Sequence, residues 1–210
     1  GRGGEVMRRR CLLVGVAGLA LAVAPAARAA AKGKDDVRAR YTKYEYRIPM
    51  RDGVKLFTSV YVPKDAGASK RYPVLLTRTP YSVAPYGADR YRTNLGPSAA
   101  FEREGFIFVW QDVRGCYQSE GTFVMQRPAR APGDTTSLDE GTDTYDTIEW
   151  LLKNVPDHNG RVGMLGVSYD GWTTIMGALE PHPALKAISP QASPADMWLG
   201  DDFHHNGAFR

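Results

Sequence analysis

Apolar and polar positions along most of the chain predict strands and helices in alternation. The expected strands cover residues 44–49, 55–62, 72–79, 106–112, 161–167 and 185–189, and the expected helices cover 98–104, 143–154 and 169–179. The first two strands flank Asp52-Gly53, a dipeptide typical of a hairpin turn. Strands that alternate with helices after such a hairpin predict an α/β domain with a mostly parallel sheet.

Three stretches fall outside this pattern. Residues 31–43 are expected to form a flexible arm, because the charged part from 32 to 40 lacks periodicity. Residues 117–140 are polar and rich in Gly, Pro, Ser and Thr, so they are expected to form a long surface loop. Residues 1–30 form the third stretch, and they leave 44–210 as the α/β domain.

The first 30 residues have the pattern of a secretory signal peptide. Met7 is followed by three arginines, an apolar run over residues 11–24 and the small-x-small sequence Ala27-Arg28-Ala29. The apolar run is shorter than the ~20 residues that a membrane-spanning helix needs. We therefore expect a periplasmic or secreted protein with no stable membrane association after signal removal, and we interpret the six residues before Met7 as upstream reading frame.

Charge and cysteine content exclude several function classes. The first 29 residues hold five of the 27 basic residues and one of the 23 acidic ones, which leaves 22 of each in the remainder. The basic pI of 9.1 is therefore no indication of nucleic-acid binding. Cys11 lies in the signal segment, so Cys116 stands alone, with no internal disulfide and no ligand cluster for structural zinc. No cofactor is predicted.

The stretch 161–171, RVGMLGVSYDG, predicts a buried strand that turns sharply into a helix. Gly166 and Gly171 lack the Cβ atoms that would block such a turn, and Ser168 would lie at its tip. A nucleophilic serine needs this geometry, because its Oγ must project from the sheet while backbone N–H groups face the developing oxyanion. The pattern G-x-S-x-G is imperfect, since Asp170 stands where the second glycine belongs, and a serine after an apolar run is also common as a loop or N-cap residue.

Candidate functional groups end three of the predicted strands. In parallel sheets such groups gather beyond the carboxyl ends of the strands. Tyr81 follows the strand 72–79, Asp112 and Arg114 end the next one, and Ser168 ends the strand 161–167.

Several ordered motifs together resemble the CocE/NonD group of serine hydrolases. They are Met50-Arg51-Asp52-Gly53, Arg78-Thr79-Pro80-Tyr81, Gln111-Asp112-Val113-Arg114-Gly115, Ser119-Glu120-Gly121 and Gly166-Val167-Ser168-Tyr169-Asp170-Gly171. The group includes X-Pro dipeptidyl peptidases, cocaine esterase and the α-amino acid ester hydrolases, and its elbow reads G-x-S-Y-x-G, which accounts for the displaced glycine. The resemblance extends from about residue 43 to residue 210 and implies an α/β-hydrolase fold.

Within this group the chain is most similar to the α-amino acid ester hydrolases, on the stretches 181–186, 200–203 and 207–210. Those enzymes hydrolyse or transfer acyl groups that bear a free α-amino group, including those of β-lactam antibiotics. The resemblance implies a small-molecule ester or amide substrate and allows for a homo-oligomer. An X-Pro dipeptidyl peptidase, a general carboxylesterase and an inactive binding protein on a hydrolase scaffold remain as alternatives.

The resemblance also implies residue roles. Ser168 would be the nucleophile, while the Tyr81 hydroxyl and the Tyr169 backbone N–H would form the oxyanion hole. Asp202 would belong to the carboxylate cluster that holds the substrate ammonium group, with Asp201 as the alternative. Three charged residues near the site are interpreted as structural rather than catalytic, namely Asp112, Arg114 and Glu120.

A base for Ser168 is the missing part. Elbow hydrolases place their partners in the order Ser, acid, His, and none of His158, His182, His204 and His205 fits that order. We therefore expect the sheet to be truncated before its last strands, with the family's cap and C-terminal jelly-roll domains absent. Such an N-terminal part of a longer enzyme would be inactive alone.

Overall fold

The computed structural model describes residues 34–195, 204–205 and 208–209, all within one compact unit, Lys32–Arg210. Its strands are β1 (Tyr41–Pro49), β2 (Lys55–Pro63), β3 (Tyr72–Thr79), β4 (Ile107–Asp112), β5 (His158–Val167), β6 (Leu185–Gln191), β7 (His204–His205) and β8 (Ala208–Phe209). Its helices are α1 (Lys34–Arg40), α2 (Ala99–Glu104), α3 (Glu140–Asn154) and α4 (Tyr169–Leu179). The expected signal segment and the Asp201-Asp202 pair lie outside the described residues.

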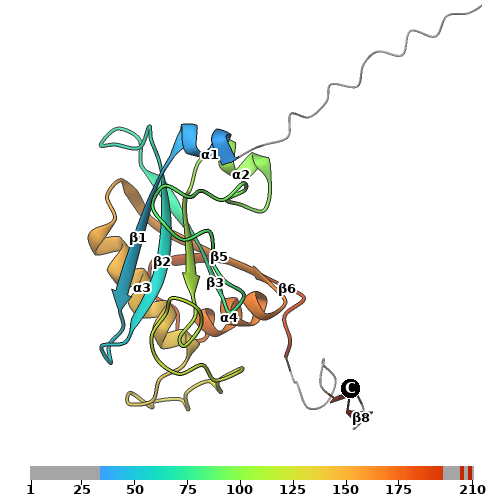
Figure 1. Cartoon of the computed structure of the whole chain (residues 1–210). Coiled ribbons are helices and arrows are strands. Elements are labelled where there is room, and N and C mark those ends of the chain that lie inside the picture. Colours follow the sequence, from blue (N-terminus) through green and yellow to red (C-terminus); the bar gives the residue numbers. More distant parts are fainter. Residues whose placement is uncertain (1–33, 196–203, 206–207, 210) are drawn as a thin grey trace, which may run out of the picture. The chain divides into compact units, whose positions relative to one another are not determined.

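Six strands form one mixed sheet in the order β1-β2-β4-β3-β5-β6, side by side in Figure 1. β1 and β2 make the antiparallel hairpin, and β2 also runs antiparallel to β4. The pairs β3–β4, β3–β5 and β5–β6 are parallel. The predicted α/β fold with a mostly parallel sheet is confirmed, and the carboxyl ends of β3, β4 and β5 bring their loops to one edge.

Alternating side chains of the strands supply a core on each face of the sheet. On one face Leu76 and Met164 pack with Ile148 and Leu151 of α3 in the larger cluster. On the other face Leu75, the neighbour of Leu76, packs with aromatic residues of β1, β2 and β4. Because both faces of the central strands are covered, β3 is buried along nearly its whole length.

Residues 34–43 do not form the flexible arm that their composition predicts. They form α1 and the start of β1, and Val37 is fully buried in the second core cluster. Arg40 donates to the Glu102 carboxylate at 3.1 Å, and Figure 1 shows α1 and α2 together at one end of the sheet. The buried Val37 and the Arg40–Glu102 ion pair help to dock this short charged helix, and neither produces a visible periodicity in the sequence.

The helix α3 begins three residues before its predicted start, at Glu140. Asp139 caps it, because the Asp139 carboxylate accepts the Thr142 N–H at 2.8 Å while the Thr142 hydroxyl receives the Asp139 N–H at 3.0 Å. Its first turns are polar yet buried, and the apolar pattern starts only further along.

At the far edge of the sheet, β6 pairs only with β5 among the described residues and is largely exposed. Nor does the described part of the chain contain a helix long and apolar enough to cross a membrane.

Candidate active site

The turn between β5 and α4 has the geometry of a nucleophile elbow. Ser168 lies between the last residue of β5 and the first residue of α4, and its backbone angles are φ 60° and ψ −123°. A non-glycine residue with positive φ is strained, and such strain clusters at functional sites. Ser168 is exposed, and although it occupies the N-cap position its hydroxyl makes no capping hydrogen bond. Ser168 therefore lacks the helix-capping role that serine most often has at this position.

Neither glycine position of the motif has room for a side chain. A Cβ on Gly166 would lie 2.0 Å from the Asp170 carbonyl oxygen, and a Cβ on Gly171 would lie 2.6 Å from the Gln191 carbonyl oxygen. The same Gln191 carbonyl accepts the Ser168 N–H at 2.9 Å. The displaced second glycine thus belongs where the helix crosses the end of β6, and the turn is fixed by backbone contacts on both sides.

The two residues predicted for an oxyanion hole lie beside each other. Tyr169 is the first residue of α4, and the first N–H groups of a helix have no partner within the helix. The ring of Tyr81, which is 62% exposed, contacts the Tyr169 ring edge-on at a centroid distance of 6.3 Å. The structure therefore brings Tyr81 next to the elbow, although β3 and β5 are far apart in the sequence.

The loop that carries Tyr81 is anchored on both sides. The Thr79 hydroxyl accepts the Tyr81 N–H at 3.1 Å, and the buried Asp112 carboxylate accepts the Val83 N–H at 2.9 Å. Asp112 also accepts from the Tyr86 hydroxyl at 2.9 Å, and burial raises the pKa of Asp112. Its oxygens are engaged in holding the loop, in agreement with the structural role predicted for it.

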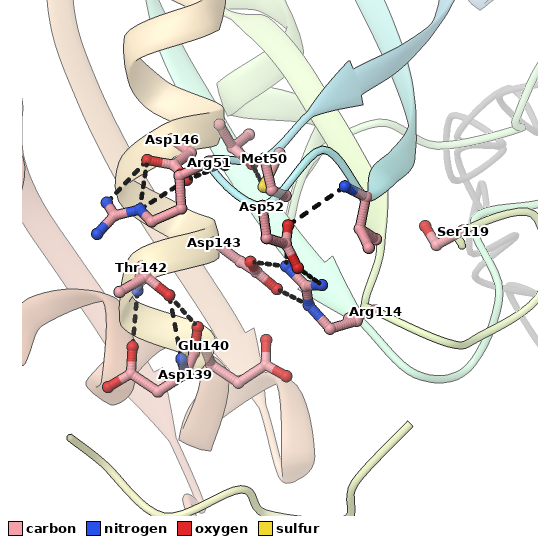
Figure 2. Close-up of polar contacts among 12 residues, drawn as sticks. Met50, Arg51, Asp52, Arg114, Ser119, Asp139, Glu140, Thr142, Asp143 and Asp146 are labelled. Carbon is pink, nitrogen blue, oxygen red and sulfur yellow. Dashed lines mark hydrogen bonds and ion pairs between the residues drawn. The ribbon is translucent and has the colours of Figure 1, made fainter. Parts of the chain in front are cut away.

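Two buried arginines link the elements around the site to α3. Arg78, fully buried on β3, donates to the Gln111 side chain at 2.7 Å and to the Glu140 carboxylate at 2.7 Å. Arg114 lies between Asp52 of the hairpin turn and Asp143 of α3, as Figure 2 shows, with contacts of 2.6 and 2.7 Å.

The remaining charges near the site are also paired. One turn along α3 from Asp143, Asp146 receives the Arg51 guanidinium at 2.8 Å (Figure 2). Glu120 accepts the Lys55 N–H at 3.0 Å. These pairs hold the hairpin turn, α3 and the loop after β4 together, which agrees with the structural interpretation of Arg114 and Glu120.

The long loop after β4 reaches the elbow as well. The Tyr169 hydroxyl accepts the Gln126 N–H at 2.8 Å, and the Phe123 ring contacts the Tyr169 ring at 6.3 Å. Burial raises the pKa of the Tyr169 phenol to about 12. The predicted surface loop is thus partly tied to the elbow by Tyr169.

Asp170 follows as the second residue of α4, and its environment is unusual. Its Oδ1 atom is buried without a hydrogen-bond partner among the described residues. Burial raises the pKa of Asp170 to about 6.

The histidines whose side chains the structure describes contact other groups, away from Ser168. His158 is the first residue of β5 and Ser168 follows the last one, so the ten residues of the strand separate them by roughly 30 Å at about 3.3 Å per residue. His158 contacts the Leu152 carbonyl at 2.8 Å, and His182, just before β6, contacts the Glu149 carboxylate at 2.9 Å. Neither is a base for Ser168. The side chains of His204 and His205 are outside the described part, as is Asp202.

Comparison with known proteins identifies the family. Residues 52–210 match the X-Pro dipeptidyl-peptidase (S15 family). The chain belongs to this family. Cocaine esterase of Rhodococcus sp. (strain MB1 Bresler) is 35% identical over 161 residues, which are 77% of this chain and 25% of that enzyme. The predicted kinship with the CocE/NonD hydrolases and the α/β-hydrolase fold are both confirmed.

Two solved structures are more similar to this chain in sequence. The crystal structure of an aminopeptidase from the marine sediment archaeon Thaumarchaeota archaeon is 48% identical, with a TM-score of 0.69, over 81% of this chain and 28% of that one. An α-amino acid ester hydrolase is 40% identical, with a TM-score of 0.70, over 94% of this chain and 31% of that one. The chain therefore spans about a quarter to a third of the length of these three relatives.

Sequence reasoning singled out Ser168, Tyr81 and Tyr169, which the structure brings together, but it missed the contacts around them. Arg78 and Thr79 were named only as parts of a family motif. Asp170 was named only as the residue that interrupts the G-x-S-x-G pattern. A charged residue within the apolar run 72–79 was the one available signal for Arg78, since a buried arginine requires a buried carboxylate partner.

Proposed function

We propose that the protein is a serine hydrolase that acts through an acyl-enzyme on α-amino acid esters and related amides. Ser168 attacks the substrate carbonyl, and the Tyr81 hydroxyl and the Tyr169 N–H donate to the oxyanion that forms. The observation that carries the proposal is the elbow itself. An exposed serine is held at strained backbone angles, and its hydroxyl has no capping role.

Electrostatics at the start of α4 support the same chemistry. The positive end of the helix dipole and the free N–H groups of the first turn favour negative charge at this position. A tetrahedral intermediate places a negative oxygen there, within reach of the Tyr169 N–H. The Tyr169 hydroxyl accepts the Gln126 N–H, so this side chain holds the loop after β4 beside the elbow.

The preference for an α-amino group is supported by the two relatives with the higher identities. One is named an aminopeptidase and the other an α-amino acid ester hydrolase, and both names refer to substrates that present an α-amino group. Asp202 is the proposed partner of that group, because an ammonium that leaves water needs a carboxylate at hydrogen-bond distance. Neither His158 nor His182, the histidines whose side chains are described, is the base that takes the Ser168 proton.

The test compares substrates that differ in one feature, with the protein at its full natural length. We expect a phenylglycine methyl ester to be hydrolysed with a higher kcat/KM than its des-amino analogue. Asp202→Asn should raise KM for the amino-bearing ester and leave the des-amino ester unaffected. An equal effect on the two esters would contradict the role of Asp202.

The same assay also tests the alternative substrate classes. A peptide anilide with a free amino-terminal residue tests aminopeptidase activity, and an X-Pro anilide tests the activity after which the family is named. Preference for either anilide over the esters would replace the proposed substrate class while keeping Ser168. Labelling of wild type but not of Ser168→Ala by a fluorophosphonate probe separates an enzyme from an inactive hydrolase scaffold.

A further inference from the structure

The loop after β3 contains a chain of hydrogen bonds that ends on the carboxylate of Asp112. The Tyr86 hydroxyl donates to Asp112 Oδ2 at 2.9 Å, and the Ser82 hydroxyl lies 3.0 Å from the Tyr86 hydroxyl. Ser82 Oγ in turn accepts the Ala84 N–H at 3.1 Å. Asp112 is the last residue of β4 and is fully buried. The chain therefore joins a buried carboxylate of the sheet to the residue directly after Tyr81.

The carboxylate fixes the direction of every bond in this chain. An ionised carboxylate only accepts hydrogen bonds, and a phenol has a single hydrogen to donate. Because Tyr86 gives its hydrogen to Asp112, the hydrogen between the two hydroxyls must come from Ser82. The Ser82 oxygen then has only lone pairs left, and one of them accepts the Ala84 N–H. The chain thus has a single arrangement of donors and acceptors.

This chain holds a strained residue beside Tyr81. Ser82 has a φ of 81°, a conformation that residues with a Cβ rarely adopt, and such angles persist only where the surroundings enforce them. The hydroxyl chain enforces them from one side, together with the Val83 N–H, which donates to Asp112 Oδ1 at 2.9 Å. On the other side, the Thr79 hydroxyl accepts the Tyr81 N–H at 3.1 Å.

Tyr86 is itself held by the sheet. Its ring packs edge-on against the ring of Phe57, a buried residue of β2, at a centroid distance of 5.1 Å. The position of its hydroxyl is therefore set by β2 through the ring and by β4 through Asp112. The side chain of Tyr81, in contrast, is 62% exposed, so its position depends on the backbone that carries it.

We propose that Tyr86 is a positioning residue for the oxyanion hole. Through Ser82 it keeps the backbone after Tyr81 in its strained conformation, and so it sets the Tyr81 hydroxyl where the oxyanion develops. The inference rests on the proposed function, because it assumes that the Tyr81 hydroxyl stabilises the oxyanion. Misplacement of a reacting group by about 1 Å costs about 100-fold in rate, so an anchor of this kind is a condition for catalysis.

The test breaks the chain at each hydroxyl in the full-length protein, with kcat and KM measured on the ester hydrolysed best. Tyr86→Phe removes the donor to Asp112 and keeps the ring against Phe57, and Ser82→Ala removes the other hydroxyl. We expect each to lower kcat about 10-fold, because the loop shifts by only a fraction of an ångström. KM should change little, since the lost contact acts in the transition state. The double variant should lose little more than either single one, because both changes break the same chain.

Matched controls separate positioning from general damage. Tyr72→Phe also removes a tyrosine hydroxyl that donates to an aspartate, Asp65 at 3.0 Å, but at the opposite end of β3, so its kcat should equal that of wild type. In a Tyr81→Phe background, Tyr86→Phe should cause little further loss, because the hydroxyl that it positions is already gone. Urea unfolding checks that each variant is folded. If Tyr86→Phe is not, Ser82→Ala tests the same chain from its other end.

Three results would overturn the inference and leave the proposed function intact. The first is a kcat near wild type in folded Tyr86→Phe, or in Ser82→Ala where that variant replaces it. The second is a rise in KM at unchanged kcat, which would assign Tyr86 to substrate binding. The third is an undiminished loss by Tyr86→Phe in the Tyr81→Phe background, or an equal loss in Tyr72→Phe. Unchanged turnover of Tyr81→Phe itself would instead remove the oxyanion assignment, and this inference with it.

Discussion

The strained backbone of Ser168 predicts that the candidate nucleophile destabilises the protein. Its angles, φ 60° and ψ −123°, are the mirror image of an ordinary extended conformation. Glycine adopts such angles freely, whereas residues with a Cβ do not. Replacing Ser168 by glycine should therefore stabilise the fold, while replacing it by alanine removes the hydroxyl and keeps the strain. Both changes remove the Ser168 hydroxyl.

The size of the effect follows from two opposing contributions. Holding a non-glycine residue at such angles costs about 1–3 kcal/mol, and glycine lowers the strain to nearly nothing. Glycine also gains conformational freedom in the unfolded chain, which offsets about 0.5–1 kcal/mol of that benefit. We expect Ser168→Gly to be more stable than Ser168→Ala by about 0.5–2 kcal/mol. The Ser168 hydroxyl makes no capping hydrogen bond, so its loss cancels in the comparison.

Urea unfolding of the two variants at full natural length measures the difference as a shift in midpoint at constant m. The same pair of substitutions at Ser98 is the control. Ser98 also precedes a helix without a side-chain capping bond, but its φ is −156°. It therefore reports the ordinary preference for glycine over alanine at a helix start. A gap between the two variants at Ser168 that does not exceed the gap at Ser98 would refute the claim of strain.

Other predictions concern the support of the site. Gly166→Ala places a Cβ 2.0 Å from a backbone oxygen of α4 and should cost about 3 kcal/mol together with most activity, whereas Gly67→Ala, with nothing within 4 Å, should leave the urea midpoint unchanged. Tyr81→Phe should lower kcat by a factor that corresponds to about 3 kcal/mol, and near-normal turnover would rule out its oxyanion role. Arg78→Met should cost about 3–5 kcal/mol in urea unfolding because it leaves Glu140 buried and unpaired. Adding Glu140→Gln should recover part of that loss, and strictly additive costs would show that the pair does not interact.

The elements of this fold were largely predictable because they depend on local patterns. The strand 72–79 and the helix 169–179 have the same bounds in the structure as in the prediction. Errors arose where tertiary contacts outweigh composition. Residue Val37 docks a helix in a stretch whose charges predict an arm, and Asp139 starts α3 before the apolar pattern begins.

The candidate site was predictable only in part, for a related reason. Ser168 and Gly166 lie within one short motif, and the geometry of a strand-to-helix turn follows from that motif. The hydrogen bonds that support the site join residues far apart along the chain, such as Arg78 and Glu140, which are 62 positions apart. Burial turns such pairs into strong constraints, but the sequence carries no periodic signal for them.

The contact between the Ser168 N–H and the Gln191 carbonyl ties the candidate nucleophile to the last residue of β6. The turn that exposes Ser168 is therefore complete only after β6 has paired with β5. During refolding, Ser168 would then acquire its backbone geometry late, together with strand pairing at this edge rather than with the formation of α4. In the full-length protein, the rate at which Ser168 becomes reactive toward an active-site probe would therefore measure the rate at which β6 pairs with β5.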